Sequence, residues 1–262
     1  MTQSLSGSHI WVTGAGKGIG HALALHLAEL GVRVTASART PDDLESLAEE
    51  ARSKALPGTI HPLVLDVTDG EACRAAPAQA AQLAGRPIDY AVLNAGTHKP
   101  LRLKEFSAEA VRYLSEVNVI GTANCLEGLL PEMVDRKGGT IAVVASVAGY
   151  TGLPTASAYG ASKAAVINMI ESLKPEADAH GVRLLLVNPG FVRTPLTDKN
   201  TFEMPFLMEP EAAAARIARA LARKGGFEVT FPRRFTCMMK LLSMLPYGLR
   251  FSLTRKTVPA DE

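Results

Sequence analysis

Short runs of apolar and β-branched residues recur along the chain and alternate with longer segments rich in Ala, Leu and Glu. Residues of the first kind favour strands, and those of the second kind favour helices. The pattern predicts strands over residues 9–13, 32–36, 60–65, 90–93, 140–145, 182–187 and 227–231. It predicts helices over residues 19–30, 42–54, 107–135, 156–179 and 211–224.

This alternation predicts an α/β fold, in which a mostly parallel sheet carries helices on both faces. No stretch rich in Gly, Ser or Pro divides the chain, and no internal repeat is visible. We therefore expect a single doubly wound domain over residues 1–231, followed by a C-terminal helical extension over residues 232–262. Ligands of such folds bind beyond the carboxyl ends of the strands, so the residues after each strand are the candidates for a site.

The composition fits a globular protein with a substantial core, since 47% of the 262 residues are apolar. A net charge of +2 gives no general reason to expect nucleic-acid binding. Cys73, Cys125 and Cys237 lie far apart and lack metal-ligand spacing, which argues against a disulfide framework or a zinc site. The chain shows no signal-peptide pattern and no run of about 18 apolar residues, so we expect a cytoplasmic protein.

A glycine-rich turn, Thr13-Gly-Ala-Gly-Lys-Gly-Ile-Gly20, follows the first predicted strand and precedes an apolar helix. Glycines let the backbone approach a pyrophosphate, whose charge is favoured at a helix N-terminus. Gly18 stands where a P-loop needs a Ser or Thr for magnesium, so the turn indicates a dinucleotide rather than a nucleoside triphosphate. The expected cofactor contacts are Gly14, Gly16, Lys17, Gly18, Ile19 and Gly20.

The residues after the second strand bear on which dinucleotide binds. NAD sites carry an acidic residue there for the ribose hydroxyl, whereas NADP sites accommodate the 2′-phosphate with an arginine. No acid occurs between Leu30 and Thr40, and Arg39 follows the strand. Lys17 adds a second positive charge, so the two cations together favour NADP(H). The alternative is that both are ordinary surface charges.

Tyr159 and Lys163 lie four residues apart in a predicted helix, and Ser146 follows the strand before it. At this spacing the phenol and the ammonium share one helix face and can point into one cleft. A free tyrosine has a pKa near ~10, and a cation beside it lowers that pKa toward the neutral range. The three residues are candidates for proton transfer, although such a pair also occurs on solvated helices without function.

Three further motifs complete a pattern: Asn94-Ala95-Gly96 after the fourth strand, Asn118 in the long predicted helix, and Pro189-Gly190 after the sixth strand. With these motifs in this order and spacing, the sequence resembles the short-chain dehydrogenase/reductase family over nearly the whole chain. The resemblance implies a Rossmann sheet of about seven strands and hydride transfer with a nicotinamide cofactor. It implies a catalytic tetrad of Asn118, Ser146, Tyr159 and Lys163.

The resemblance implies a role for each member of this tetrad. Tyr159 exchanges a proton with the carbonyl or alcohol oxygen, while hydride passes between the substrate carbon and the nicotinamide. Lys163 lowers the pKa of the tyrosine and holds the nicotinamide ribose. Ser146 donates a hydrogen bond to the developing oxyanion, and Asn118 anchors a water that links Lys163 to solvent. The plainer alternatives are a strand-end turn at Ser146 and a helix irregularity at Asn118.

Further cofactor contacts follow from the same resemblance. Asp66 and Val67 correspond to the adenine contact, although Asp66 could instead cap the following helix. Ala145 stands where many members carry a second serine, which leaves the tetrad intact. The implied contacts are Asp66, Val67, Asn94, Ala95, Gly96, Tyr159, Lys163, Pro189, Gly190, Val192 and Thr194.

Residues 195–210 correspond to the family's mobile lid over the substrate. The segment is strongly apolar, and methionine adapts to irregular ligands, so we expect a hydrophobic ketone or aldehyde as substrate. The alternative is that these side chains pack against the helix that begins near Glu211. The apolar residues are Leu196, Phe202, Met204, Phe206, Leu207 and Met208.

Residues 232–260 interleave basic and apolar residues and contain no acid. This pattern suggests a surface that lies on anionic lipid, covers a partner subunit or covers the substrate cleft. The alternative is a helix pair, broken at Pro246, that packs on the core of its own chain. The basic residues are Arg233, Arg234, Lys240, Arg250, Arg255 and Lys256.

The sequence as a whole predicts an oxidoreductase that transfers hydride between NADP(H) and a carbonyl compound or secondary alcohol. The alternative from another class is a non-catalytic NADP(H)-binding sensor or membrane-surface scaffold, against which the intact tetrad argues. The resemblance implies a homodimer or homotetramer formed through the helices that carry Asn118 and Tyr159. Peripheral contact with the inner face of a membrane through residues 232–260 is the further partner expectation.

Overall fold

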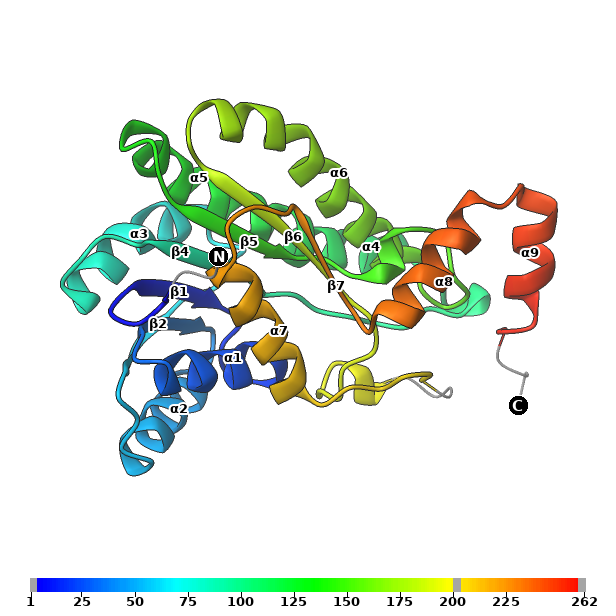
Figure 1. Cartoon of the computed structure of the whole chain (residues 1–262). Helices are drawn as coiled ribbons and strands as arrows, with labels where there is room; N and C mark the ends of the chain where they lie inside the picture. Colours follow the sequence, from blue (N-terminus) through cyan, green and yellow to red (C-terminus); the bar gives the residue numbers. More distant parts are fainter. Residues whose placement is uncertain (1–3, 200–203, 259–262) are drawn as a thin grey trace.

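A seven-stranded parallel sheet forms the centre of the computed structural model, which describes residues 4–199 and 204–258. The strand order is β3-β2-β1-β4-β5-β6-β7, so the direction of winding reverses between β1 and β4 (Figure 1). This order confirms the predicted doubly wound α/β fold. The strands are β1 (His9–Thr13), β2 (Arg33–Ala38), β3 (Thr59–Val64), β4 (Tyr90–Leu93), β5 (Thr140–Val144), β6 (Arg183–Pro189) and β7 (Glu228–Phe231).

Helices cover both faces of the sheet, with α1, α2 and α7 on one face and α3 to α6 on the other (Figure 1). Two further helices, α8 and α9, follow β7 and lie at one end of the molecule. The helices are α1 (Gly18–Glu29), α2 (Pro41–Ser53), α3 (Gly70–Ala84), α4 (Ala108–Ser115), α5 (Gly121–Asp135), α6 (Ser157–Ala179), α7 (Pro210–Ala222), α8 (Arg233–Met244) and α9 (Tyr247–Arg255).

The alternation of side chains along β1 shows how the sheet divides the core. Ile10 and Val12 pack with α1, α2 and α7, whereas Trp11 between them packs with α3, α5 and α6. The indole of Trp11 donates a hydrogen bond of 2.9 Å to the hydroxyl of Ser37, which satisfies its buried N–H. Both faces of the strand are buried, as expected when helices cover a parallel sheet on both sides.

Helix α3 was not among the predicted helices. Its N-cap residue Asp69 accepts a hydrogen bond of 3.0 Å from the Ala72 amide, and Gly85 ends it with a φ of 69°. These capping residues are the local signal that marks the helix. The helix brings Cys73 to Cys125 of α5, with 3.9 Å between their sulfur atoms, although the two free cysteines are far apart in sequence.

The helix predicted over residues 107–135 contains a break. A π-helical turn, η2 (Glu116–Ile120), separates α4 from α5 and includes the fully buried Asn118. Such turns insert one extra residue into a helix and often occur at functional sites.

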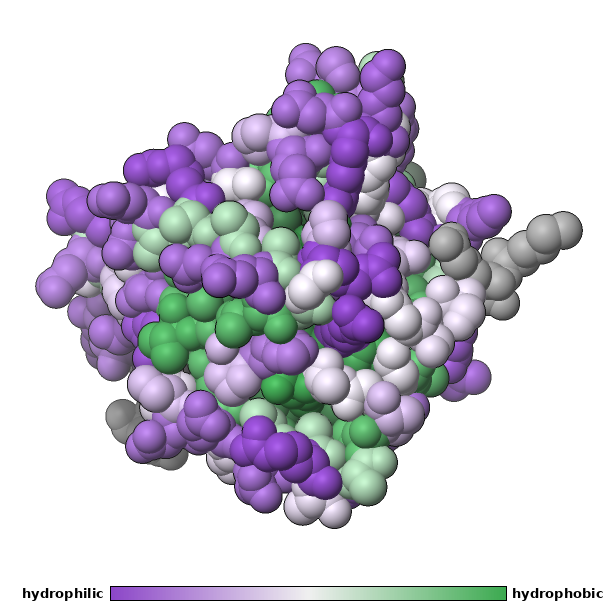
Figure 2. All heavy atoms as spheres, turned by 90° about the vertical axis from the view of Figure 1, so that its left-hand side faces the viewer, coloured by the Kyte–Doolittle hydropathy of each residue, from purple (hydrophilic) through white to green (hydrophobic). Residues whose placement is uncertain are grey.

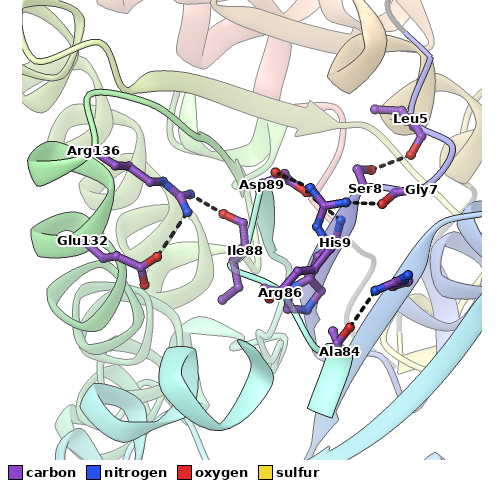
Figure 3. A network of polar contacts seen from close by, with 11 residues as sticks. Leu5, Gly7, Ser8, His9, Ala84, Arg86, Ile88, Asp89, Glu132 and Arg136 are labelled. Atoms are coloured by element: carbon purple, nitrogen blue, oxygen red, sulfur yellow. Dashed lines mark hydrogen bonds and ion pairs between the residues drawn. The ribbon is translucent and has the colours of Figure 1, made fainter. Parts of the chain in front are cut away.

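A network of polar contacts ties together the amino edge of the sheet, opposite the residues that follow the strands (Figure 3). The Asp89 carboxylate accepts a hydrogen bond of 2.8 Å from the His9 amide and pairs with Arg86 at 3.0 Å. Arg86 also donates to the carbonyl of Gly7, and Arg136 donates to that of Ile88. These contacts fix the amino ends of β1 and β4 and involve no residue of the carboxyl edge.

The surface on the left of Figure 1 is shown in Figure 2, where hydrophilic side chains surround smaller apolar patches. Within residues 4–199 and 204–258, no helix is both long enough and apolar enough to cross a membrane.

Gly128 permits the close packing of α5 against α3, because a Cβ atom there would lie 2.5 Å from the carbonyl oxygen of Cys73. We predict that Gly128→Ala lowers the free energy of unfolding by about 1–3 kcal/mol, since the backbone of α3 must shift. Urea unfolding followed by circular dichroism measures the change.

Gly248 of α9 is the matched control, because it is also helical and a Cβ atom there has open space around it. Gly248→Ala should leave stability unchanged or raise it by up to about 1 kcal/mol through helix propensity. Equal effects of the two substitutions would contradict a steric role for Gly128.

Candidate active site

The glycine turn connects β1 to α1 and lies against the residues that follow β4 and β6. Gly18 has a φ of 59°, and a Cβ atom there would lie 2.8 Å from Cγ2 of Thr194. A Cβ atom at Gly14 would lie 2.8 Å from the Cα of Ala95. Glycine is therefore required at these positions for the backbone to pass so close to its neighbours.

Asn94 holds this turn in place from the end of β4. Its side-chain amide donates hydrogen bonds of 3.1 Å to the carbonyls of Thr13 and Gly14. The Thr13 hydroxyl in turn accepts from the amides of Asn94 and Ala95, at 3.0 and 3.1 Å. The first and fourth strand ends are thus joined by a reciprocal set of hydrogen bonds.

Lys17 and Arg39 flank one point of the turn. A Cβ atom at Gly16 would lie 3.3 Å from Cβ of Ala38. Gly16, which precedes Lys17, therefore packs closely against Ala38, which precedes Arg39. Both cations are exposed, and Lys17 Nζ lies 3.5 Å from the Asp43 carboxylate in the first turn of α2. Sequence reasoning considered acids only between Leu30 and Thr40 and therefore missed Asp43. Its charge balances that of Lys17, and among the described residues Arg39 forms no ion pair.

Asp66 and Val67 follow β3 in a tight turn. The Asp66 carboxylate accepts from the amide and the hydroxyl of Thr68, at 2.9 and 2.8 Å, while Asp69 caps α3. The alternative that Asp66 caps this helix is therefore wrong. The carbonyl of Val67 accepts a hydrogen bond of 2.9 Å from Asn124 of α5, which fixes the turn against that helix.

Ser146 and Tyr159 come together because the turn after β5 packs closely on α6. The Ser146 hydroxyl accepts a hydrogen bond of 3.1 Å from the Ala148 amide and so begins the short 3-10 helix η3 (Val147–Gly149). A Cβ atom at Gly149 would lie 2.8 Å from the backbone carbon of Lys163. This approach lets the Ser146 hydroxyl hydrogen bond to the phenol of Tyr159, one turn of α6 before Lys163.

Lys163 is buried, with 5% of its surface exposed, and its ammonium donates a hydrogen bond of 3.0 Å to the carbonyl of Val144. Burial lowers the pKa of Lys163 to about 8, because the charged form loses hydration. The ammonium lies 5.9 Å from the centre of the Tyr159 ring. It therefore keeps a positive charge near the phenol at neutral pH.

Burial raises the pKa of the Tyr159 phenol above its ordinary value, and the hydrogen bond from Ser146 opposes that rise. This direction is opposite to the lowering that the sequence predicted from Lys163. The reason is that loss of hydration disfavours the phenolate more than the groups around it favour it.

Asn118 connects the loop after β4 to α6. Its side-chain oxygen accepts a hydrogen bond of 2.8 Å from the Thr97 amide, and its nitrogen donates to the Thr97 carbonyl at 3.0 Å. The same nitrogen donates to the hydroxyl of Ser162 at 2.9 Å. Ser162, which sequence reasoning did not name, donates at 2.8 Å to the carbonyl of Tyr159. Asn118 thus positions the first turn of α6 through Ser162.

A pocket at the carboxyl edge brings many of the predicted residues together. Gly14, Gly16, Lys17, Gly18, Gly20, Arg39, Asp66, Val67, Ala95 and Asn118 are not part of its wall. The predicted residues that line it are Ile19, Asn94, Gly96, Ser146, Tyr159, Lys163, Pro189, Gly190, Val192 and Thr194.

Comparison with known proteins shows which family has this arrangement. The model of the short chain dehydrogenase family matches residues 8–204. The chain belongs to the short-chain dehydrogenase/reductase family. An uncharacterized oxidoreductase of Myxococcus xanthus is 39% identical over 249 residues, which cover 94% of this chain and 95% of the relative.

Other relatives have more specific names. A 3-oxoacyl-[acyl-carrier-protein] reductase, FabG, of Thermotoga maritima is 36% identical over 74% of this chain and 78% of its own. The crystal structure of a short chain dehydrogenase from Burkholderia cenocepacia in complex with NADP has a TM-score of 0.81 and is 27% identical, covering 96% of this chain and 99% of its own. A Brucella melitensis 3-oxoacyl reductase with bound NAD has a TM-score of 0.74 at 28% identity, covering 87% and 90%. Members similar to this chain therefore bind either nicotinamide cofactor.

The segment that corresponds to the family's lid lies partly outside the described residues, as does Phe202. Leu196 lines the pocket, whereas Met208 forms a bridge with Val192 and packs against the core beside α7. Phe206 is half exposed and lies 6.4 Å from the ring of Phe235 in α8. Leu196 of this segment thus faces the pocket, whereas Met208 packs on the core as the alternative expects.

Three residues in or beside the pocket carry no signal in the sequence. The imidazole of His98 meets the ring of Tyr159 edge-on, with 4.5 Å between their centres. Thr97 and Thr197 join the pocket wall from the loops after β4 and β6. Their positions depend on how two loops fold over the sheet edge, and no motif marks them.

The buried ammonium of Lys163 makes stability depend on pH. Its pKa is about 8 in the folded protein and 10.5 as the ordinary value, so above pH 8 the unfolded chain binds a proton that the folded chain has lost. Stability should therefore rise from pH 8 toward 10.5, by roughly 3 kcal/mol in total for this group. Below pH 8 the full cost of burying the charge is present.

Lys163→Met removes this group and provides the control. We predict that urea unfolding of the nucleotide-free protein shows the wild type gaining stability relative to Lys163→Met as pH rises from 8 to 10. A constant difference between the two proteins across this range would show that Lys163 keeps an ordinary pKa.

Proposed function

We propose that the protein is an NADP(H)-dependent carbonyl reductase, or the reverse alcohol dehydrogenase, that acts on a hydrophobic ketone, aldehyde or secondary alcohol. One observation carries this proposal. Ser146, Tyr159 and Lys163 line a single pocket that also borders the end of the glycine turn. The arrangement provides a proton donor, a hydrogen-bond donor and a buried cation where a family cofactor binds.

Tyr159 and Ser146 would act on the substrate oxygen. Tyr159 would pass its phenolic proton to the carbonyl oxygen, while hydride for the carbonyl carbon would come from a bound nicotinamide cofactor. Ser146 donates a hydrogen bond to the charge that develops there, an effect of roughly 3 kcal/mol in comparable sites. A high pKa in the nucleotide-free protein keeps Tyr159 protonated, which is the form that reduction requires.

Lys163 and Asn118 would support Tyr159 from behind. The ammonium of Lys163 stabilises the phenolate left after proton transfer and, by family resemblance, holds the ribose hydroxyls of the cofactor. Asn118 positions α6 and by the same resemblance anchors the water that resupplies the proton. The supporting observations are the burial of both side chains and their shared neighbour, Gly96.

The remaining predicted contacts would surround the cofactor. The glycine turn from Gly14 to Gly20 suits the pyrophosphate, with Asn94 holding the turn, and Asp66 and Val67 suit the adenine. Arg39 suits the 2′-phosphate of NADP, because Lys17 already pairs with Asp43. The loop after β6 suits the nicotinamide carboxamide, through Pro189, Gly190, Val192 and Thr194.

The proposal extends to the organisation of the chain. Residues 1–231 form the catalytic unit, with the lid at about 195–210, and residues 232–262 form the extension. Tyr113 and Ile120 are 47% and 45% exposed on the helices that family members use for dimers, which supports a homodimer or homotetramer. A cytoplasmic protein with peripheral membrane contact through residues 232–260 completes the proposal.

A panel of ketones and aldehydes of increasing chain length, followed by NADPH absorbance, tests the reaction. Tyr159→Phe should lower turnover roughly 100- to 10,000-fold, because the proton donor is lost. NADPH binding, measured by fluorescence titration, should remain nearly unchanged. Tyr113→Phe on exposed α4 is the control, and undiminished activity of Tyr159→Phe would refute the mechanism.

Arg39→Asp tests the cofactor assignment. A carboxylate at this position repels a 2′-phosphate and can accept from a ribose hydroxyl, so the preference for NADPH over NADH should fall on the order of 100-fold. The ratio of kcat/KM for the two cofactors measures it. Arg52→Asp on α2 is the control, and an unaltered ratio in Arg39→Asp would make Arg39 a surface charge only.

A further inference from the structure

The C-terminal helix pair, α8 and α9, gathers the exposed apolar side chains of the molecule. Half of the sixteen large apolar residues that are exposed in the described part of the chain fall within residues 238–258. Helix α9 buries only Thr254. The exposed residues of the pair, together with Val258 just after it, are Met238, Leu241, Met244, Tyr247, Leu249, Phe251 and Leu253.

These apolar residues form stripes that end in positive charges. Leu249 and Leu253 of α9 and the C-cap residue Lys256 follow one another at intervals of about one helical turn. Tyr247, Phe251 and Arg255 form a parallel stripe, in which the two aromatic rings stack with 5.6 Å between their centres. An exposed apolar stripe flanked by cations is the pattern of a helix that lies in a membrane interface.

The charge of the helix pair points to an anionic partner. Residues 232–258 contain six basic residues and no acid. Two of the six are used within the chain, since Lys240 pairs with Glu228 and Arg250 donates to the carbonyls of Ser243 and Leu245. The other four are exposed and form no ion pair within the described residues; they are Arg233, Arg234, Arg255 and Lys256.

Internal contacts hold the helix pair rigidly against the rest of the molecule. Glu228 of β7 accepts hydrogen bonds from Tyr150, Asn188 and Lys240 and so joins α8 to the turn after η3 and to β6. Arg250 of α9 also donates to the hydroxyl of Thr151, at 3.2 Å. The exposed apolar surface is therefore presented in a fixed orientation.

The inner face of α8 forms part of the surroundings of the pocket. A Cβ atom at Gly190, which lines the pocket, would lie 2.8 Å from the ring of Phe235. Phe235 and Met239 pack with Val147, the residue after Ser146, and the Phe235 and Phe191 rings lie 5.3 Å apart. Helix α8 thus packs on one side behind the residues that line the pocket and carries exposed apolar residues on the other.

We propose that the C-terminal helix pair docks on the surface of an anionic phospholipid bilayer, so that the enzyme receives a carbonyl substrate carried on an acyl chain. The substrate part of this inference rests on the proposed reductase function. Apolar side chains of α9 enter the interface, and the four free cations contact lipid phosphates. The apolar wall around Phe235 then receives the chain of the substrate.

A second copy of this chain is a poorer occupant of the same surface. A symmetric dimer through α8 and α9 would join two surfaces that each carry Arg233, Arg234, Arg255 and Lys256, with no acid in residues 232–258 to balance them. An anionic bilayer supplies the missing negative charge.

Co-sedimentation with vesicles tests the docking. The nucleotide-free protein is mixed with vesicles of phosphatidylcholine alone and with vesicles of equal parts phosphatidylcholine and phosphatidylglycerol. We expect strong pelleting only with the second, decreasing as salt rises from about 0.1 to 0.5 M because headgroup attraction is screened. Absence of pelleting, or equal pelleting with both vesicle types at all salt concentrations, would overturn the proposal.

Two variants assign the binding to α8 and α9. Arg234→Glu/Arg255→Glu/Lys256→Glu should weaken vesicle binding on the order of 100-fold, at about fivefold for each cation. Leu249→Gln/Leu253→Gln should weaken it about tenfold or more. The matched control is Leu103→Gln/Lys104→Glu, which changes an exposed pair of the same types elsewhere and should bind like wild type.

Urea unfolding midpoints equal to that of the wild type show that each variant is folded, as expected for exposed positions. Sedimentation velocity without vesicles measures assembly in parallel. Loss of a dimer in Leu249→Gln/Leu253→Gln, together with unchanged vesicle binding, would make the surface a contact between copies and refute the bilayer.

The rate of NADPH oxidation distinguishes membrane docking from the reductase reaction. With a long-chain methyl ketone in the vesicles, phosphatidylglycerol should raise the wild-type rate, whereas the rate with a short water-soluble ketone should not change. Arg234→Glu/Arg255→Glu/Lys256→Glu should lose only the increase in rate that phosphatidylglycerol causes. Reduction of the short ketone without vesicle binding refutes the docking alone, and vesicle binding without reduction of any carbonyl refutes the proposed function alone.

Discussion

Burial of the Lys163 ammonium is the constraint on which the carboxyl edge of the sheet depends. A buried cation needs an acceptor, and the carbonyl of Val144 at the end of β5 provides it. After β4, Gly96 lies beside the ammonium and beside Asn118, since a Cβ atom there would lie 3.4 Å from Lys163 Nζ and 3.1 Å from Asn118 Oδ1. The backbone of Gly149 packs directly on that of Lys163. Lys163 therefore contacts the ends of two strands, and Tyr159 lies one turn away on the same helix.

Residues that act through local backbone geometry could be predicted from the sequence, whereas contacts between distant elements could not. The glycine turn, Ser146 after β5 and the spacing of Tyr159 and Lys163 are properties of short segments. The pairing of Asp43 with Lys17 arises because α2 begins beside the glycine turn, and the contact of Asn118 with Thr97 crosses two elements. Helix α3 was missed because Ala residues and an internal Pro77 blur its apolar periodicity. The direction of the Tyr159 pKa shift depends on burial, which no spacing reveals.

The polar residues at the two edges of the sheet make different kinds of contact. At the amino edge, Asp89, Arg86 and His9 satisfy one another and fix the strands. At the carboxyl edge the side chains of Asn94, Asn118 and Ser146 form hydrogen bonds that fix the loops around the pocket. Helix α8 extends this edge, since Phe235 faces the loops and Lys240 is tied to Glu228. Helix α8 therefore belongs to the same packed unit as the loops around the pocket.

Because of the π-helical turn at Glu116–Ile120, one continuous helix packs against two different helices. Before it, Leu114 packs with Ala158 of α6; after it, Cys125 and Leu129 pack against α3. An extra residue in a helix rotates everything beyond it by about 100°, which is the angle one residue occupies in a turn of 3.6. Removal of a single residue here would restore a regular helix and turn one of these faces away from its partner. The register of the helix, and not only its composition, therefore determines which faces meet α6 and α3.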